Sequence, residues 1–202
     1  MSRKLLLDDI SDVRAYERER AGFRAEVIAT KQQRRVAIGP FVTVLFENRD
    51  TIRFQVQEMA RAEKITTDAA IQAELDVYNP LIPEPGSLAA TLFIELTSKD
   101  ELTEWLPKLV GIEHAVELRL GDASTGDHVE TIAARPDSAH QKQLTRETVT
   151  ASVHYIHFDL TAEQAQHFAS GSVSVGINHP NYTYISQLDE ASKNALLADL
   201  HC

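Results

Sequence analysis

Cysteine is almost absent from this sequence, because Cys202, the last residue, is the only one. A disulfide framework within one chain is therefore excluded, which fits a reducing compartment, and we expect a cytoplasmic protein. Long hydrophobic runs are also missing, since none approaches the roughly 18 residues of a membrane span. The N-terminal stretch "MSRKLLLDDI" has too few hydrophobic residues for a secretory signal. We therefore expect no membrane association.

Positive charge is scarce as well. The chain has 20 Lys and Arg residues against 30 Asp and Glu residues, which gives a net charge of −10. Broad binding to a phosphate backbone needs a dense basic surface, so we expect no nucleic-acid partner. The sequence also lacks G-x-G-x-x-G, the P-loop, G-x-S-x-G and the Glu-x-x-His pair of di-iron bundles. These absences leave the chain without a common enzyme signature.

The composition permits a sizeable core, since 43% of the 202 residues are hydrophobic, and we expect a single domain over residues 1–202. The spacing of hydrophobic residues predicts three helices in the first part of the chain, over residues 8–35, about 50–64 and about 67–78. The stretch "NPLIPEPG" cannot continue a helix, because it holds three prolines and a glycine. It divides a helix-rich N-terminal lobe, 1–79, from a strand-rich C-terminal lobe, 86–202.

Alternation of hydrophobic and polar residues predicts strands in the C-terminal lobe. The four that matter most are 114–121, 128–134, 152–160 and 172–179, which we expect to form an antiparallel meander. The capping boxes "SKDE" and "TAEQ" predict helix starts, and the polar segment 135–150 predicts a mobile loop. The predicted fold class is α+β, with a curved, mostly antiparallel sheet, meander or barrel-like, that is packed by several helices.

Three of these strands place one histidine each on their hydrophobic face. Because side chains alternate along a strand, His114, His154 and His179 share parity with hydrophobic neighbours. His157 falls on the opposite, mixed face, so the pair in "HYIH" does not chelate if this segment is a strand. In the expected meander, His154 and His179 lie on adjacent strands, about 5 Å apart at the backbone, and His114 lies at the same edge of the sheet.

Neutral imidazoles that converge in a hydrophobic shell bind zinc or non-haem iron and leave one coordination position for water or substrate. The sequence therefore predicts an iron or zinc site formed by His114, His154 and His179. A carboxylate can complete a site of this kind, and the candidates are Glu47, Glu58, Glu74 and Glu95. The alternative is that each histidine is a buried structural residue with hydrogen bonds to the backbone.

Several blocks resemble one bacterial family. They are "RRVAIGPFVTVLFENRDTIRFQVQEM", "ELDVYNPLIPEPGSLAATLFIEL", "LVGIEHAVELRLGD" and "NHPNY". Over roughly residues 3–200 the chain is similar to the family catalogued as domain of unknown function 3501. The resemblance implies a gene context beside a rubrerythrin-type iron protein and an iron–sulfur oxidoreductase, and hence a role near redox metabolism or oxidative stress. It implies no catalytic residues.

These observations support alternative functions. The first is a mononuclear iron or zinc protein, as binder or enzyme, linked to redox metabolism. The second is a non-enzymatic partner or assembly factor of a rubrerythrin-type or iron–sulfur protein, which would dock through the helical lobe or through residues 135–150. The third is a small-molecule binding module. The sequence leaves the reaction, the substrate and the oligomeric state open.

Overall fold

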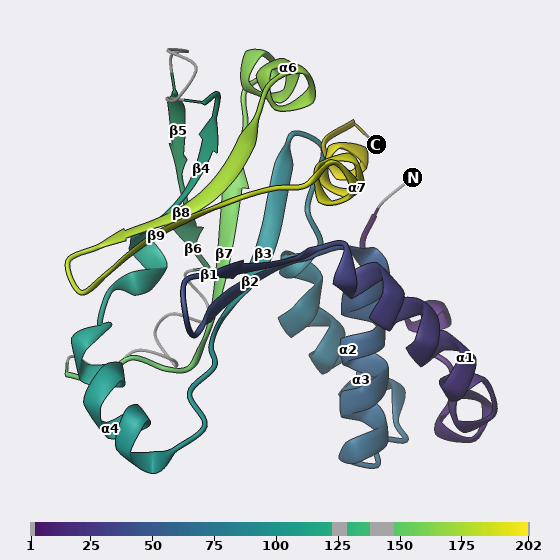
Figure 1. Cartoon of the computed structure of the whole chain (residues 1–202). Helices are drawn as coiled ribbons and strands as arrows, with labels where there is room; N and C mark the ends of the chain where they lie inside the picture. Colours follow the sequence, from purple (N-terminus) through teal and green to yellow (C-terminus); the bar gives the residue numbers. More distant parts are fainter. Residues whose placement is uncertain (1–2, 123–128, 138–147, 202) are drawn as a thin grey trace.

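The computed structural model describes residues 3–122, 129–137 and 148–201 (Figure 1). Its α-helices are α1 (Val13–Gln32), α2 (Arg49–Ala62), α3 (Asp68–Tyr78), α4 (Lys99–Lys108), α6 (Ala162–Ser170) and α7 (Glu190–His201). Three short 3₁₀ helices are η1 (Leu7–Asp9), η2 (Asn79–Leu81) and η3 (Ile112–His114). The strands are β1 (Arg35–Ile38), β2 (Val42–Glu47), β3 (Ser87–Ile94), β4 (Val116–Leu120), β5 (Glu130–Ala133), β6 (Arg135–Pro136), β7 (Val153–Asp159), β8 (Val173–His179) and β9 (Tyr182–Gln187).

The strands form two antiparallel sheets. Sheet A has the order β1-β2-β3-β7-β6, and sheet B has the order β5-β4-β8-β9. The α+β prediction is confirmed, but the expected single sheet is divided in two, and β9 was not predicted. Sheet A takes β1 and β2 from the expected N-terminal lobe and β3, β6 and β7 from the expected C-terminal lobe, so the two lobes share one sheet.

The main hydrophobic core lies between the two sheets. Alternate residues of sheet A, such as Phe46 and Phe158, meet alternate residues of sheet B, such as Leu118 and Val175, and all four are fully buried. Each such side chain contributes about 1.5–3 kcal/mol when it leaves water. Helix α6 joins β7 of sheet A to β8 of sheet B, and its Phe168 is buried in the same core.

Helices α1, α2 and α3 cover the other face of sheet A, which we call its outer face (Figure 1). A second hydrophobic cluster packs this layer, and Ile52, Val56 and Leu75 are fully buried in it. Helix α1 is tied to α2 by Glu58, which accepts hydrogen bonds from Arg20 and from the hydroxyl of Tyr16. The outer face of sheet A is therefore covered by helices over part of its area.

Helices α2, α4 and α6 start where the sequence predicts, whereas α1 begins at Val13, capped by Asp12, and not at residue 8. Ser98 and Glu101 form the capping box of α4, and Thr161 and Gln164 form that of α6, as expected from "SKDE" and "TAEQ". Asn48 caps α2 in the same way, together with Thr51. Local polar side chains thus satisfy the first backbone N–H groups of these helices.

A tight corner closes sheet A against sheet B. Gly39, between β1 and β2, has a positive φ of 71°, and a Cβ there would lie 2.6 Å from the hydroxyl of Tyr182. That hydroxyl donates to the carbonyl of Ile38 and accepts from the N–H of Val42. The corner therefore needs a glycine for both its backbone angle and its lack of a side chain.

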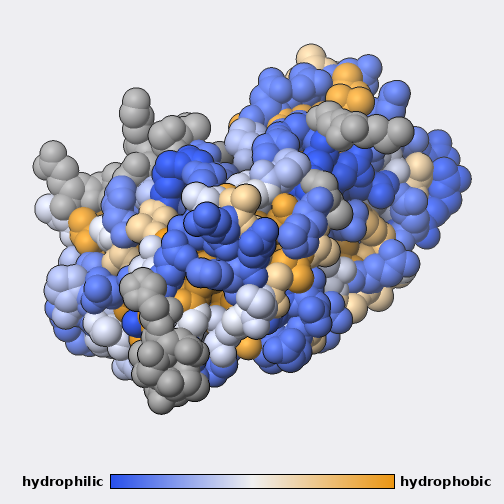
Figure 2. Space-filling view, turned by 90° about the horizontal axis from the view of Figure 1, so that it is seen from above, coloured by the Kyte–Doolittle hydropathy of each residue, from blue (hydrophilic) through white to orange (hydrophobic). Residues whose placement is uncertain are grey.

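The helices of the described residues include none long and hydrophobic enough to span a membrane. Figure 2 shows the molecule from above, and hydrophilic residues cover most of this face, with hydrophobic ones in small separate groups. The described residues of this face therefore form no broad hydrophobic area.

One buried ion pair fastens the last helix to sheet A. Arg34, just before β1, donates two hydrogen bonds to Asp199 of α7, the shorter at 2.6 Å, and a third to the carbonyl of Ala195. The side chains of Arg34 and Asp199 are only 6% and 15% exposed. A pair shielded from water in this way is costly to break from one side.

Replacement of Arg34 by Met should lower the free energy of unfolding by about 3 kcal/mol, because it leaves the carboxylate of Asp199 uncompensated. Urea unfolding followed by circular dichroism measures the loss. The control is Arg35→Met, which breaks the exposed Arg35–Glu95 pair and should cost less than about 1 kcal/mol. Equal losses in the two variants would contradict this assignment.

Candidate functional site on the outer face of sheet A

The three histidines predicted as metal ligands lie in different environments. His114 is exposed at the end of η3, outside any strand, whereas His154 is buried on β7 and His179 is buried at the end of β8. β7 lies between β3 and β6 in sheet A, and β8 lies between β4 and β9 in sheet B. The prediction that His154 and His179 lie on adjacent strands is wrong, because α6 carries the chain from one sheet to the other.

Both ring nitrogens of His179 are used by the backbone. Nε2–H donates to the carbonyl of Val110 at 3.2 Å, and Nδ1 accepts from the N–H of Asn181, also at 3.2 Å. A metal ligand needs a free imidazole lone pair, and the lone pair of Nδ1 is engaged here. His179 therefore joins the β8–β9 turn to the segment that follows α4, which is the structural role considered as the alternative.

His154 belongs to a buried polar cluster on the inner face of sheet A. Its Nε2 lies 2.9 Å from the carbonyl oxygen of Ala151 and 2.9 Å from the hydroxyl of Thr150, and its Nδ1 lies 3.9 Å from Glu113. Burial lowers the pKa of His154, and the negative charge of Glu113 opposes this shift. His154 is therefore a neutral core residue at neutral pH.

The carboxylate that faces His154 is Glu113, which was not among the predicted candidates. Those four lie elsewhere: Glu47 on the outer face of sheet A, Glu58 on α2, Glu74 on α3 and Glu95 after β3. Within the part of the chain that the structure describes, no group of three or more His, Cys, Asp or Glu side chains is arranged to hold a metal ion. Binding of iron or zinc stays a prediction, without support from the positions of these histidines.

The other face of β7 carries residues better placed for chemistry. The register of sheet A puts Tyr155 opposite Thr91 of β3, and it puts Ala89 of β3 opposite both His157 of β7 and Glu47 of β2. Residues directly opposite each other on antiparallel strands share a face. Glu47, Thr91, Tyr155 and His157 therefore all lie on the outer face, on three neighbouring strands.

A proline-rich segment, 79–87, divides this outer face into two hollows. Tyr78 and Leu81 line one hollow, and Pro80 and Ile82 line the other. The consecutive residues Leu81 and Ile82 are both buried, so the segment is packed against the molecule along this stretch. Each hollow is therefore bounded by the sheet on one side and by this segment on another.

The larger hollow, which we call the His157 cleft, has a volume of about 510 Å³. Its charged and titratable lining residues are Lys4, Glu84, Arg135, Asp137, His157 and Asp159. Ion pairs join Lys4 to Glu84 at 3.0 Å and Arg135 to Asp159 at 3.1 Å. The cleft is thus polar and carries charges of both signs.

His157 is the buried titratable group of this cleft, only 8% exposed. Its Nε2 lies 3.4 Å from the carboxylate of Asp137, and Nδ1 has no hydrogen bond within the described residues. Burial and the positive charge of Arg135 lower the pKa of His157, although Asp137 opposes the shift. The imidazole is therefore neutral at neutral pH, with one nitrogen oriented by a carboxylate.

Alternation along the strand places His157 on the mixed face, and the polar composition of residues 135–150 predicts a mobile loop. The short strand β6 begins that segment and pairs with β7, which places Arg135 opposite His157. Residues 138–147 of the expected loop lie outside the described residues. Tyr155, His157 and Asp159 alternate along the strand and so share one face. This row of polar residues was the feature of the sequence that could have identified the cleft.

A family model described as "Protein of unknown function (DUF3501)" matches residues 4–200. The chain belongs to this family. It is also similar to a crystal structure, at 1.90 Å resolution, of a novel protein of unknown function from Burkholderia pseudomallei K96243. The two chains are 36% identical over 98% of this chain and 99% of that chain, with a TM-score of 0.86. No curated protein matches.

The resemblance seen in the sequence blocks is confirmed by the family match. Both the family and the Burkholderia protein are described as being of unknown function, so neither match tests metal binding, redox chemistry or partners. The role beside a rubrerythrin-type or iron–sulfur protein therefore stays a prediction.

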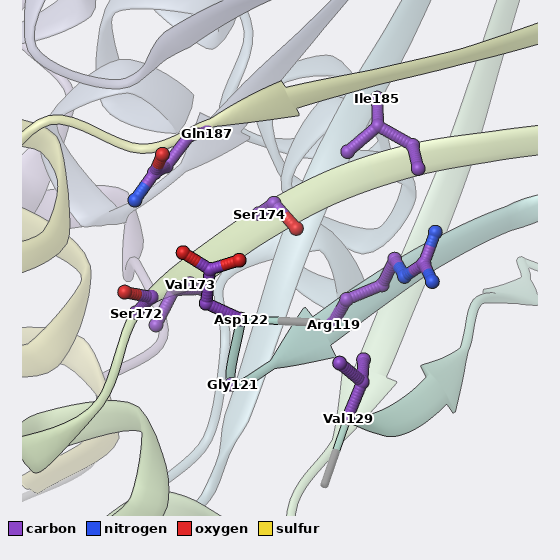
Figure 3. Close-up of a pocket in the computed structure, with 9 residues that line it drawn as sticks. All are labelled: Arg119, Gly121, Asp122, Val129, Ser172, Val173, Ser174, Ile185 and Gln187. Carbon is purple, nitrogen blue, oxygen red and sulfur yellow. The ribbon is translucent and has the colours of Figure 1, made fainter. Parts of the chain in front are cut away.

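A further groove of this DUF3501 protein lies on sheet B, with a volume of about 200 Å³ (Figure 3). Asp122, Ser172 and Gln187 gather at one end, and Arg119 and Ile185 lie at the other. Asp122 and Val129, which line the groove, are the last and first described residues on either side of the gap at 123–128. Its titratable lining residues, Arg119 and Asp122, are both partly exposed, so among the described residues this groove lacks the buried, oriented titratable group of the His157 cleft.

The buried imidazole of His154 should make stability pH-dependent. Its folded-state pKa lies below the unfolded value of about 6.5, so the unfolded chain binds the proton more readily. The free energy of unfolding should fall as pH drops below about 6.5, and His154→Gln should reduce this dependence. Urea unfolding at pH 7.5 and 5.5 measures it. The exposed residue His201 provides the control, and a His201→Gln variant with the same reduction would refute this origin.

The metal hypothesis has a direct measurement. Protein purified without an affinity tag is reconstituted with iron and zinc and analysed for bound metal. Because both ring nitrogens of His179 bond to the backbone, His179→Ala should keep the wild-type metal content. Stoichiometric metal that is lost in each of the variants His114→Ala, His154→Ala and His179→Ala would instead support the site predicted from sequence.

Proposed function

We propose that this DUF3501 protein binds a small polar molecule in the His157 cleft and moves a proton on it, with His157 as the general base. The observation that carries the proposal is a buried neutral imidazole with one nitrogen beside a carboxylate and the other open to hydrogen bonding, in a cleft of about 510 Å³. A perturbed histidine in a cleft is a common mark of acid–base chemistry.

The Asp137–His157 pair has the geometry of an orienting dyad. The carboxylate of Asp137 lies 3.4 Å from Nε2, slightly longer than an ordinary hydrogen bond. Contacts of this kind are often long in a free enzyme and tighten once substrate is bound. A proton on Nε2 leaves the lone pair on Nδ1, where it is available to take a proton from a ligand. Asp137 also stabilises the imidazolium that forms, because its negative charge opposes the lowering of the pKa of His157 by burial and by Arg135.

The rest of the cleft favours a polar ligand. Arg135 and Asp159 pair at its edge, with side chains that are 61% and 63% exposed. Lys4 also donates to the carbonyl of Ile82 at 2.7 Å, which holds its ammonium at the proline-rich segment. Exposed ion pairs exchange partners at low cost, so these charges can bind polar groups of a ligand.

A thermal-shift screen of small polar metabolites should find compounds that raise the Tm of the wild type and leave that of His157→Gln unchanged. The matched control is His114→Gln, which removes an exposed histidine from η3 and should keep the wild-type response. In any reaction that such a compound undergoes, His157→Gln should lower turnover by about 100-fold or more. A screen in which every stabilising compound raises the Tm of the wild type and of His157→Gln equally would contradict the proposal.

The same proposal predicts a pH profile. Because the base must be unprotonated, turnover should fall as pH drops through the folded-state pKa of His157, which lies below its usual value. Asp137→Asn removes the charge that opposes this shift, so the fall should move to still lower pH. Steady-state rates between pH 4.5 and 8 measure both curves, and an unchanged profile in Asp137→Asn would exclude the dyad.

A further inference from the structure

The smaller hollow on the outer face of sheet A is a second candidate site, which we call the Glu47 cavity. It lies between sheet A and the helical layer and has a volume of about 200 Å³. A cavity of about 150 Å³ in a protein core is large enough for benzene, so this one has room for a molecule of that size or slightly larger. Its polar lining residues are Lys31, Glu47, Gln55, Tyr78, Thr91 and Tyr155.

Glu47 is buried with only part of its hydrogen-bonding capacity used. It is 7% exposed, and its Oε1 accepts a hydrogen bond from the hydroxyl of Thr91 at 2.6 Å. Its Oε2 has no hydrogen bond or ion pair within the described residues. A buried carboxylate with so little compensation is costly, and a ligand that brings a positive group would offset that cost.

Lys31 supplies the opposite charge at the same cavity. Its Nζ lies 5.5 Å from the centroid of the Phe54 ring, and no ion pair joins it to Glu47 in the part of the chain that the structure describes. A cation–π contact of this kind contributes about 0.5–1 kcal/mol at an exposed site, so it does not prevent Lys31 from turning to an anion. A carboxylate and an ammonium thus line one cavity without pairing.

The remaining polar groups add hydrogen bonds but no charge. Burial, with Tyr78 and Glu47 nearby, raises the pKa of Tyr155 to about 12, so its phenol stays neutral at physiological pH. Gln55 adds an amide, with donors and an acceptor. Among the described residues, the charges of the cavity lining are therefore those of Glu47 and Lys31.

The other walls of the cavity are hydrophobic. Ile52 and Leu81 come from the helical layer and the proline-rich segment, and Phe93 and Val153 come from neighbouring strands of sheet A. A ligand that fills the cavity therefore needs an apolar part beside its charged groups.

We propose that the Glu47 cavity binds a small zwitterion of amino-acid size with an apolar side chain. Its ammonium group would donate to Glu47, its carboxylate would accept from Lys31, and its side chain would pack against Ile52, Leu81 and Val153. This site is independent of the His157 cleft, since the two hollows are lined by different residues on either side of the segment 79–87.

The test compares L-valine with its two singly charged analogues, isobutylamine and isovalerate, by isothermal titration calorimetry on the full chain. L-valine should bind, and each analogue should bind at least tenfold more weakly, because each lacks one of the two ionic contacts. Equal binding of isobutylamine and L-valine would overturn the zwitterion assignment, as would equal binding of isovalerate. Absence of L-valine binding would overturn the proposal as a whole.

Variants locate the site. Glu47→Gln keeps the shape and the bond to Thr91 but removes the charge, and it should weaken L-valine binding at least tenfold. The matched control is Glu95→Gln, because Glu95 also accepts from a threonine hydroxyl of sheet A, that of Thr43, but lies outside the cavity. Lys31→Gln, at a half-buried helix position that tolerates polar residues, should weaken binding at least tenfold even if Glu47→Gln fails to fold. L-valine affinity that is unchanged in Lys31→Gln, or reduced equally in Glu95→Gln, would overturn the placement.

His157→Gln separates this proposal from the proposed function. It should leave L-valine affinity unchanged, because His157 does not line the Glu47 cavity. Loss of L-valine binding in His157→Gln would place the amino acid in the cleft and overturn the assignment to the Glu47 cavity.

Discussion

The central strands β3 and β7 are covered on both faces, by sheet B on one side and by the helical layer and the segment 79–87 on the other. Side chains alternate along β7, so each polar residue of this strand faces either sheet B or the helical layer. His154 faces sheet B and becomes part of the core, with hydrogen bonds to Thr150 and Ala151. Tyr155 and His157 face the other way, toward the two hollows. Both candidate sites therefore lie on the outer face of β7, and the inner face contributes to the core.

The carboxylates of Glu58 and Glu47 differ in how fully their charge is compensated by neighbouring groups. Glu58 accepts from Arg20 and Tyr16, and the Arg20 guanidinium, first among these partners, lowers the pKa of Glu58 to about 2. Such a satisfied carboxylate stabilises the contact between α1 and α2 and has little capacity left for a ligand. Glu47 has one hydrogen bond, from Thr91, and no ion pair within the described residues. This contrast explains why Glu47, and not Glu58, marks a candidate ligand site. Glu58 lies on α2, and Glu47 faces the helical layer from β2.

Local signals in the sequence predicted much of the fold. The strands predicted over 114–121, 128–134, 152–160 and 172–179 and the capping boxes at Ser98 and Thr161 depend on neighbouring residues. The structure has them as β4, β5, β7 and β8 and at the starts of α4 and α6. Pairing of distant strands could not be read in the same way, because parity tells which residues share a face but not which strand lies beside another. The sequence does not show whether the chain returns to the same sheet after α6 or crosses to the other sheet. It crosses, and His154 and His179 therefore lie in different sheets. β6 escaped prediction because two residues, Arg135 and Pro136, are too short for an alternating pattern.

The segment 79–87 connects the two proposed sites and keeps them apart. Its prolines restrict the backbone of the unfolded chain, so ordering it as a wall costs less conformational entropy than ordering a flexible loop. Leu81 borders the Glu47 cavity and Ile82 borders the His157 cleft, and both are nearly inaccessible to solvent. Leu81 and Ile82 are each packed tightly on their own side of the segment, so neither side chain can swing from one hollow into the other. Ligands in the two hollows therefore meet separate sets of side chains, although one short stretch of chain shapes both.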